Sequence, residues 1–589
     1  MKRVNKNIEK GAINNLDDYH TLNRRKFITI SALSLSVVPA FGFSDFKNMA
    51  DAKPVWLIRL LKNNDDDVSD MGKNLMTDKI LATFGALNND LNIPNVQGTG
   101  HYITRAIIAF ISSESQFFKS EDLRIKIKNA IQYMLNAQHS DGTIDLLDTN
   151  FHSTPDTGFS VENLSVSYKI LKGANIKGGE DMLEPLKKYL LKCGEALIVG
   201  GIHTPNHRWV VSAALTQLNL LFPDIRYVRR IEQWLAEHID LDPDGQYTEK
   251  STGIYSTVID KALITIANGL DKPELLDYVR KNLQMTMFFV HPNGEVVTDA
   301  SNRQDKGGIS TFENYYYSYR YLAILDKNPE FAAMCQLIEK SYFNKINGDL
   351  IHFLEDKFLW NELPTATSFS TNYAKFFPYS NLVRIRRDLW DATLLINNPN
   401  FLTFHKNNAI LQGMRINASF FGKGQFQSPT IKQEQNQWIM YNKLEGVYYQ
   451  PFSQDKIATD GNWEKMPRST RTKSEIQHLE TIIKIKEISG GIEIEFDMKG
   501  TDGVPVSLEL IFRTGGKLTG VQQSEKEPNS YLFGQNSGTY TVGNDVIQFG
   551  PGKSKHKGIH LRGGLPADTN STSVYLTDFT PFKHTITLK

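Results

Sequence analysis

The sequence predicts an α+β protein of several domains, with an N-terminal incomplete (α/α) toroid followed by a C-terminal antiparallel β-sandwich. From about residue 54 to 345 the apolar residues recur at spacings of three and four, the period of an amphipathic helix. After about Arg387 the pattern changes to alternating and β-branched stretches, which are typical of strands. At 589 residues the chain is also too long for a single hydrophobic core.

The N-terminus carries the pattern of an export signal. Arg24-Arg25-Lys26 precedes an apolar run from Ile28 to Phe43, which contains small residues and is too short to span a membrane. The adjacent arginines are similar to those of a twin-arginine signal. We therefore expect residues 1–44 to be a signal peptide and the protein to be periplasmic or secreted, with an ordinary core helix as the alternative. No later segment is long and apolar enough to be a membrane span.

The toroid is expected to span residues 45–385 and to be the catalytic domain. Short loops rich in Asp, Asn, Gly and Pro separate a dozen or so helices, which favours helical hairpins arranged in a ring. An α-solenoid is the alternative, although the sequence has no fixed repeat period. The clearest helices are expected at 160–174, 181–199, 205–221, 225–239, 252–270, 273–289, 309–327 and 329–343.

The antiparallel β-sandwich is expected to span residues 386–589. Its stretches, such as Thr481-Ile-Ile-Lys-Ile485, alternate or are β-branched, and Gly, Asn and Asp separate them at roughly regular intervals. The linker is expected near 345–390, where Pro364, Pro378 and several aromatic residues cluster.

Composition excludes some classes of function. The net charge is +1 and the chain has no basic tract, which argues against a nucleic-acid partner. The two cysteines are too few for a disulfide framework or a zinc site. No cofactor is required by the chemistry considered below. The sequence has no tight cluster of His and Asp, and a structural divalent metal is left open.

Polar residues that suit proton transfer gather on two segments of the helical region. Asn206-His207-Arg208 supplies an amide, an imidazole and a guanidinium, and Tyr255 follows about fifty residues later. This set can remove a proton from a carbon next to a carboxylate. The amide and the cation reduce the charge of the carboxylate, and the phenol or the imidazole moves the proton. The residues therefore predict β-elimination at a uronic acid.

These segments resemble those of the heparinase II/III-like polysaccharide lyases, which join an α/α toroid to an antiparallel β-sandwich. In that family a toroid helix carries Asn-His, and an Asp-Gly-x-aromatic-x-Glu-x-Ser-x-x-x-Tyr stretch follows about fifty residues later. Here these positions read Asn206-His207 and Asp244-Gly-Gln-Tyr-Thr-Glu-Lys-Ser-Thr-Gly-Ile-Tyr255. The family also places a further His in an early sandwich strand, in a His-x-His-x-Asp setting that this chain lacks. His405 and His478 are the candidates to replace it.

Three stretches are similar to a narrower group, the lyases that remove rhamnose from a 4-linked glucuronate in arabinogalactan side chains. They are Asn150–Asp156, Ser301–Asp305 and Ala418–Phe426. The resemblance thus implies a secreted lyase that cleaves a 4-linked uronic acid, and a polysaccharide or oligosaccharide containing that acid as its partner.

Elimination at such a uronic acid assigns a role to each candidate residue. Tyr255 and His207 share the roles of base at C5 and acid at the leaving O4, in either order, if a nearby cation stabilises the phenolate. Asn206 neutralises the carboxylate, with Arg208 or Arg303 as the cationic helper. Substrate contacts are expected from His152, Asp156, Glu249, Arg303, Gln304 and Trp209. Each residue also has a structural alternative: Asn206 could simply start a helix, and Tyr255 or Trp209 could lie in the core.

Two other classes of protein fit parts of the sequence. A glycoside hydrolase on an α/α barrel needs two carboxyl groups that face each other across a water, and the candidates are Asp156, Asp244, Glu249 and Asp299. A sugar-binding protein would use exposed aromatic residues and would have no use for the Asn-His and Tyr set. The glycan, the choice between endo and exo cleavage and the oligomeric state depend on loop shape rather than on these motifs.

Overall fold

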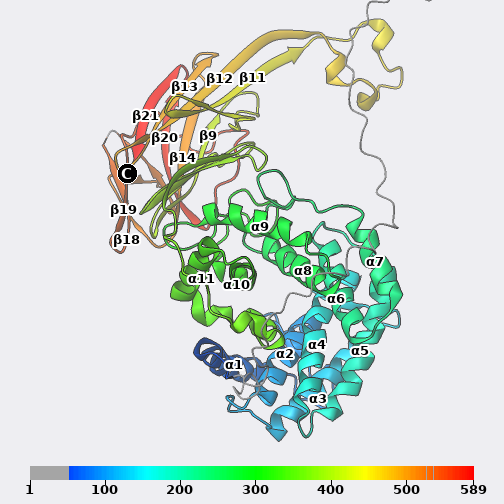
Figure 1. Cartoon of the computed structure of the whole chain (residues 1–589). Helices are drawn as coiled ribbons and strands as arrows, with labels where there is room; N and C mark the ends of the chain where they lie inside the picture. The colour runs from blue at the N-terminus through cyan, green and yellow to red at the C-terminus, as the bar shows by residue number, and fades with distance from the viewer. Residues whose placement is uncertain (1–51, 526, 535) are drawn as a thin grey trace, which may run out of the picture. The chain divides into compact units, whose positions relative to one another are not determined.

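The helices come first along the chain and the β-sheets follow, as Figure 1 shows for this computed structural model. It describes residues 52–525, 527–534 and 536–589. The expected signal peptide, residues 1–44, lies outside the described residues. Residues 54–589 form one compact unit, so that helices and sheets belong to the same body.

Twelve α-helices occur in the described part of the chain. They are α1 (Val55–Lys73), α2 (Val96–Ile111), α3 (Glu121–Ala137), α4 (Thr154–Ala174), α5 (Glu180–Val199), α6 (His207–Leu221), α7 (Ile225–Leu235), α8 (Tyr255–Gly269), α9 (Leu275–Thr286), α10 (Tyr316–Leu325), α11 (Pro329–Tyr342) and α12 (Leu350–Glu355). Helices α2, α4, α6, α8 and α10 pack in succession, and α3, α5, α7, α9 and α11 each pack against the helix before them. This is an incomplete toroid of helical hairpins.

Burial separates the two layers of the toroid. In α6 every residue from His207 to Leu218 is buried, whereas α7 buries only Tyr227 and Ile231. A helix that is buried all round belongs inside, and a helix with one apolar stripe belongs outside. The alternation of the two kinds along the chain therefore builds an inner and an outer layer.

Two large β-sheets follow the helices, and their order is β10-β11-β12-β13-β21-β19-β18-β15 in one and β16-β17-β20-β14-β9-β8-β7-β6-β5 in the other. Neighbouring strands are antiparallel, except that β17 runs parallel to β20. The first sheet consists of β10 (Ile431–Glu434), β11 (Gln437–Tyr449), β12 (Lys473–Ile488), β13 (Gly491–Gly500), β15 (Lys517–Thr519), β18 (Gly538–Val542), β19 (Asp545–Gly550) and β21 (Phe582–Leu588). The second consists of β5 (Asn372–Phe377), β6 (Leu382–Arg387), β7 (Trp390–Leu395), β8 (Leu402–Lys406), β9 (Ala409–Ala418), β14 (Pro505–Arg513), β16 (Gln522–Gln523), β17 (Ser530–Leu532) and β20 (Ser571–Phe579). The toroid itself carries two small hairpins, β1 (Leu87–Asn88) with β2 (Pro94–Asn95) and β3 (Ile144–Leu146) with β4 (Asn150–Ser153).

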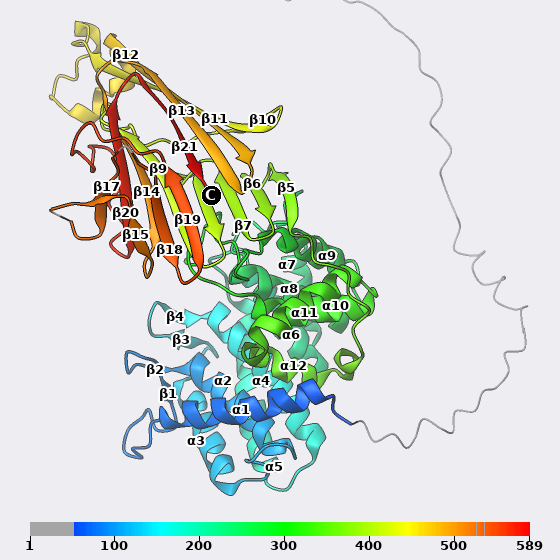
Figure 2. The same ribbon diagram turned by 90° about the vertical axis from the view of Figure 1, so that its left-hand side faces the viewer.

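The two large sheets share one hydrophobic core, and Figure 2 shows β13, β21 and β19 in one layer and β9, β14 and β20 in the other. Burial alternates along the strands. On β13, Ile492, Ile494 and Phe496 are buried, whereas Glu493 and Glu495 between them are not. Residues of one face thus point into the core and those of the other face do not, as in a β-sandwich. The predicted fold class, a toroid followed by an antiparallel β-sandwich, is confirmed.

The change from helices to strands falls earlier than the expected boundary at 385. The last helical turn ends at Trp360, and the strands start at Asn372 with β5, which pairs with β6 in the nine-stranded sheet. Strand β5 is an edge strand that buries only Phe377 fully. It therefore carries no alternating apolar pattern, and sequence periodicity could not reveal it.

One end of the toroid is fastened to the nine-stranded sheet. The carboxylate of Asp244 accepts hydrogen bonds from the backbone N–H groups of Tyr379 and Ser380 at 2.8 and 2.9 Å. Arg513 on β14 donates two hydrogen bonds to Glu295, at 2.8 and 3.0 Å. Apolar residues of both parts close the contact, namely Met285, Phe289 and Val297 with Phe377, Leu382 and Leu395.

Cys193 and Cys335 are free thiols, both buried in the toroid. Among the helices of the described residues, none has the length and apolar character needed to cross a membrane.

Candidate active site

Inner helices of the toroid begin with residues that the sequence analysis singled out. Helix α6 starts at His207, α8 starts at Tyr255, and α4 starts two residues before Asp156. Helix α6 packs between α4 and α8. The first turn of a helix carries a partial positive charge and free N–H groups. These helix starts therefore favour an anionic group nearby.

A chain of contacts joins five of the expected site residues. Asn206 Nδ2 donates to Glu249 Oε2 at 2.8 Å, and Arg303 lies 3.2 Å from the other oxygen of Glu249. The Arg303 guanidinium lies over the Tyr255 ring, 4.7 Å from its centroid, and Gln304 Nε2 donates to the Tyr255 hydroxyl at 2.6 Å. Three segments that are far apart in the sequence thus meet around one phenol.

The loop that carries the guanidinium is fastened to the segment before α8. The buried carboxylate of Asp305 accepts hydrogen bonds from Ser251 Oγ and from the backbone N–H of Gly253, both at 3.0 Å. The backbone N–H of Asn302 donates to the carbonyl oxygen of Glu249 at 3.0 Å. These hydrogen bonds therefore fix the position of the loop that carries the Arg303 guanidinium.

Asn206 and Glu249 form the buried base of this group. Asn206 is fully buried, and its Oδ1 has no hydrogen-bond partner among the described residues. Burial raises the pKa of Glu249, and the Asn206 amide and the Arg303 guanidinium act in the opposite direction. Asn206 does precede the first residue of α6, but its side chain makes no capping hydrogen bond and is held by Glu249 instead.

His207 is almost buried, at 6% exposed, and its ring makes T-shaped contacts with His203 and Phe159 at centroid distances of 4.7 and 6.2 Å. Burial is the largest of the effects that lower its pKa to about 4; His203 and Arg303 act in the same direction, and Asp156 opposes them. The imidazole is therefore neutral near neutral pH, so it can accept a proton.

A pocket of about 360 Å³ lies beside His207, lined by residues 149–155 and 201–203. Phe151, 65% exposed, and His203, whose ring touches His207, both face it. His152 also lines the pocket, and its Nδ1 lies 2.7 Å from Asp141 Oδ2. A larger depression of about 660 Å³ lies between α5 and α7 and contains no expected site residue.

Three expected residues are held in other contacts. Arg208 donates to Asp240 at 2.8 Å, and its guanidinium lies 4.6 Å from the ring of Trp209. Trp209 is fully buried and donates to the same carboxylate at 3.1 Å, so its ring is not available to a sugar. Asp156 is buried and accepts hydrogen bonds from three side chains. These contacts are structural, and they leave Arg303 as the guanidinium beside Tyr255.

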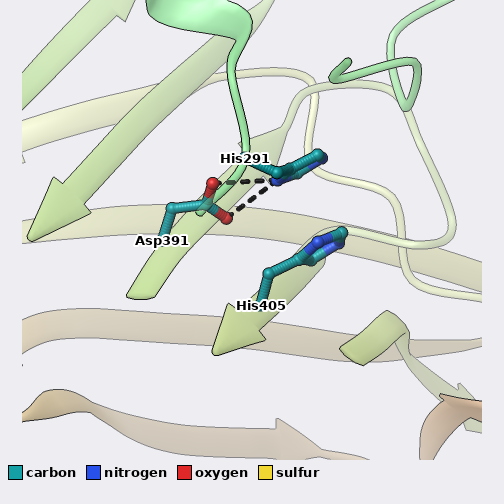
Figure 3. A group of neighbouring side chains, drawn as sticks. All are labelled: His291, Asp391 and His405. Atoms are coloured by element: carbon teal, nitrogen blue, oxygen red, sulfur yellow. Dashed lines mark hydrogen bonds and ion pairs between the residues drawn. The ribbon is translucent and has the colours of Figure 1, made fainter. Parts of the chain in front are cut away.

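The sequence analysis missed His203 and Phe151, and it missed His291 and Asp391, which form a buried group with the candidate His405 (Figure 3). A His four residues before His207 and an aromatic residue beside His152 were visible signals for the first two. The buried group draws on three separate segments, and no local spacing could show it. His405 lies in this group, and His478, the other candidate, lies opposite Glu445 in the β11–β12 pair.

No protein-family model matches this chain, and no curated protein sequence matches it. Among solved structures, it is similar to the chondroitin AC lyase of Streptomyces coelicolor A3 in complex with chondroitin sulphate, at 11% identity over 90% of this chain and 79% of that chain, with a TM-score of 0.54. It is also similar to a Paenibacillus xanthan lyase, at 10% identity over 90% of this chain and a TM-score of 0.54. The match spans 56% of the xanthan lyase chain, so this chain corresponds to little more than half of it. At sequence identities of 11% and 10%, the structural similarity to these two lyases shows a shared fold.

Proposed function

We propose that this protein is a polysaccharide lyase that cleaves a 4-linked uronic acid by β-elimination. The observation that carries the proposal is the phenol of Tyr255, which contacts the guanidinium of Arg303 and the amide of Gln304. The neutral imidazole of His207 at the start of the neighbouring helix adds a second group for proton transfer. Two structures that share the fold are a chondroitin AC lyase and a xanthan lyase, which supports the same class of reaction.

The elimination breaks the C5–H and C4–O4 bonds of the uronic acid and forms a C4=C5 double bond. The C5 proton is only weakly acidic until the charge of the neighbouring carboxylate is reduced. We assign this role to Arg303, whose side chain is 25% exposed and can form paired hydrogen bonds with a carboxylate. Glu249 forms an ion pair with the guanidinium, and the Asn206 amide donates a hydrogen bond to Glu249. The N-terminal ends of α6 and α8 add a partial positive charge, which favours the substrate carboxylate.

Two groups would then move the protons. His207 is neutral and suits the base that takes the C5 proton, whereas Tyr255 suits the acid that gives a proton to the leaving O4. The guanidinium over the ring stabilises the negative charge that the phenol gains when it loses its proton. Return of the proton from His207 to Tyr255 through water restores both groups.

Hydrolysis by a pair of carboxylates is less consistent with the contacts. Asp244 accepts two backbone hydrogen bonds from residues 379–380, and Asp156 accepts three from side chains. Glu249 is held between Asn206 and Arg303, and Asp299 accepts a hydrogen bond from Thr403. Each candidate carboxyl group therefore has protein partners, which does not suit an acid and base pair facing a water.

We further propose that the substrate is a rhamnose-capped, 4-linked glucuronate, as in arabinogalactan and gum arabic. The support is the similarity of stretches 150–156, 301–305 and 418–426 to lyases of that kind. Residues of the first stretch line the pocket beside His207, and residues of the second contact Tyr255. The signal pattern of residues 1–44 supports a periplasmic or secreted enzyme. An exported enzyme can encounter such glycans.

Ultraviolet absorbance during incubation with uronic-acid glycans tests the proposal. Gum arabic or arabinogalactan should give a rise from the new double bond conjugated to the carboxylate, together with free rhamnose. Heparan sulfate, chondroitin sulfate and alginate test other substrates of the same reaction, and a rise with one of these in place of gum arabic would replace the proposed glycan. Release of reducing sugar without any rise in absorbance would contradict the lyase assignment.

A further inference from the structure

Another pocket, the distal pocket, lies at the opposite end of the inner helices from the candidate active site. It has a volume of about 240 Å³ and is lined by later residues of α4, α6 and α8, which pack side by side, and by residues from α10 and the end of α12. The lining residues that bear on its chemistry are Lys169, Gln217, Tyr317, His352, Glu355 and Asp356.

The length of the inner helices separates the distal pocket from the candidate active site. Gln217 lies ten residues beyond His207 on α6, and Asn268 lies thirteen residues beyond Tyr255 on α8. At a rise of 1.5 Å per residue, about 15–20 Å lie between the two ends of these helices. A ligand in the distal pocket would therefore not touch the groups to which proton transfer is assigned.

Two buried side chains of the distal pocket have polar groups without a partner. Gln217 and Tyr317 are 6% and 8% exposed, yet neither the amide nor the hydroxyl makes a hydrogen bond to another described residue. Neither group is enclosed by protein atoms, so both face the space of the pocket. Burial raises the pKa of Tyr317 well above its usual value, so the hydroxyl stays protonated and can donate.

Neighbouring groups hold the lining residues in place. The Tyr317 ring contacts the rings of His352 and Phe353 at centroid distances of 5.0 and 6.5 Å. The Tyr321 hydroxyl donates to Asn268 Oδ1 at 2.8 Å, which leaves Asn268 Nδ2 without a partner among the described residues. Donors that are fixed in advance bind a ligand with less loss of conformational entropy.

The charged groups of the distal pocket already have partners. Lys169 Nζ lies 2.8 Å from Glu355 Oε1, and Asp356 Oδ1 accepts a hydrogen bond from the backbone N–H of Phe358 at 2.9 Å. His352 Nδ1 lies 3.8 Å from the other oxygen of Glu355. Two carboxylates stand against one ammonium group, and the C-terminal ends of α6 and α8 add partial negative charge. An anionic ligand is therefore disfavoured.

We propose that the distal pocket binds a neutral monosaccharide. Each sugar hydroxyl both donates and accepts, so one sugar can bond with the Gln217 amide, the Tyr317 hydroxyl and the Glu355 carboxylate together. A metal ion or a polyamine would leave the Tyr317 hydroxyl without an acceptor. Leu220 and the ring of Tyr317 offer apolar surface to the C–H groups of a sugar. The volume is below the range of about 300–1,000 Å³ for drug-sized ligands, which suits a single sugar ring.

This binding goes beyond the proposed elimination and does not depend on it. A sugar can occupy the distal pocket whether or not the other end of the toroid removes a proton from a uronic acid. Binding is therefore measured with free sugars in the absence of polysaccharide, and its failure would leave the lyase assignment as it stands.

Ligand-observed NMR on the full chain is the first test. Saturation transfer to galactose, glucose and rhamnose should show saturable binding of at least one of them. We expect a dissociation constant in the millimolar range, since a ligand of about twelve non-hydrogen atoms offers few contacts. Glucuronate and spermidine are the charged probes and should bind more weakly. Tighter binding of a charged probe, or no saturable binding of any neutral sugar, would overturn the proposal.

Variants assign the sugar to the distal pocket. Tyr317→Phe and Gln217→Leu should each raise the dissociation constant about fivefold or more, the effect of one lost hydrogen bond. His203→Gln, in the pocket beside His207, is the matched control and should bind the sugar as the natural chain does. Tyr317→Phe removes no hydrogen bond between described residues, so it keeps the test decisive if Gln217→Leu does not fold. Unchanged affinity in Tyr317→Phe, or a loss confined to His203→Gln, would overturn the assignment.

Discussion

At the scale of single residues, two tyrosines of the same stretch have opposite surroundings. Tyr247 is 1% exposed and donates a hydrogen bond to buried Asp260 at 2.8 Å. Tyr255 is half-buried, and its hydroxyl receives a hydrogen bond from the exposed side chain of Gln304. A phenol that takes part in proton transfer must be reached by substrate, so this contrast favours Tyr255 over Tyr247 for the role that we propose.

Removal of the Tyr255 hydroxyl should abolish most of the activity without affecting the fold. We expect Tyr255→Phe to lower kcat by about 10²–10⁴-fold, since a positioned acid or base contributes this much, with KM little changed. The double-bond absorbance assay measures it. Tyr448→Phe, on strand β11, is the matched control and should keep full activity. Equal kcat values for both variants would exclude Tyr255 as the acid.

The pH dependence of kcat/KM should report the unusual environment of His207. Its pKa is lowered to about 4, and only the neutral imidazole accepts a proton, so activity should persist well below pH 6 and fall as the pH passes through about 4. His203→Gln removes one of the groups that lower this pKa and should move the acid limb to higher pH. An acid limb that stays at the same pH in His203→Gln and in His207→Gln would belong to another group.

At the scale of elements, the same side chain has different roles on a helix and on a loop. Arg208 lies in the first turn of buried helix α6, where its guanidinium is paired with Asp240. Arg303 lies in a loop, pairs with Glu249 and contacts the ring of Tyr255. A guanidinium that is held within the core stabilises the fold, and one that is partly exposed beside a reactive group can bind substrate.

Substitution of the two arginines should therefore separate stability from catalysis. Arg208→Ala should lower the free energy of unfolding by about 3 kcal/mol, because it leaves the carboxylate of Asp240, whose side chain is 14% exposed, without its closest cationic partner. Arg303→Ala should lower kcat/KM by at least 100-fold and change the melting temperature far less. Denaturation curves and the absorbance assay, run on both variants, give the comparison. The reverse pattern, with Arg208→Ala stable and inactive, would return the role of cationic helper to Arg208.

At the scale of the whole molecule, the loops that carry the candidate site residues are attached to the sandwich. Asp244 and Lys250, which flank Glu249, contact the backbone of residues 379–380. Glu295, in the loop that leads to Arg303, is bound by Arg513 of β14. The site residues come from the toroid, but two of the segments that hold them are fixed on the nine-stranded sheet.

Loosening that contact should affect both stability and catalysis. Arg513→Met and Glu295→Gln should each lower the melting temperature. A double-mutant cycle should give a coupling of about 1–2 kcal/mol, between the values for exposed pairs and for buried charged hydrogen bonds. We expect kcat to fall several-fold, because Arg303 lies in the same loop. Lys486→Met, at a surface pair with Glu493, is the control and should change neither quantity. A coupling near zero would show that the sandwich does not hold this loop.

Local patterns determined much of the fold. The periodicity of residues 205–221 and 329–343 predicted α6 and α11 to within two residues, because burial of one face repeats with the turn of the helix. The helix expected at 225–239 ends at Leu235, where the following turn places His238 in the left-handed region at φ 64°. Strand β5 was missed because an exposed edge strand has no apolar alternation.

The sequence by itself also determined the candidates Asn206, His207 and Tyr255, since motif and spacing are local properties of the chain. Only the tertiary structure shows that Arg208 is paired with Asp240 and Arg303 with Glu249, and it alone brings His291 to Asp391 and His405. The physical reason is that side-chain partners are fixed by packing between segments that lie far apart in the sequence, 32 residues for Arg208 and Asp240 and 100 residues for His291 and Asp391. Such contacts leave no period and no spacing in the sequence.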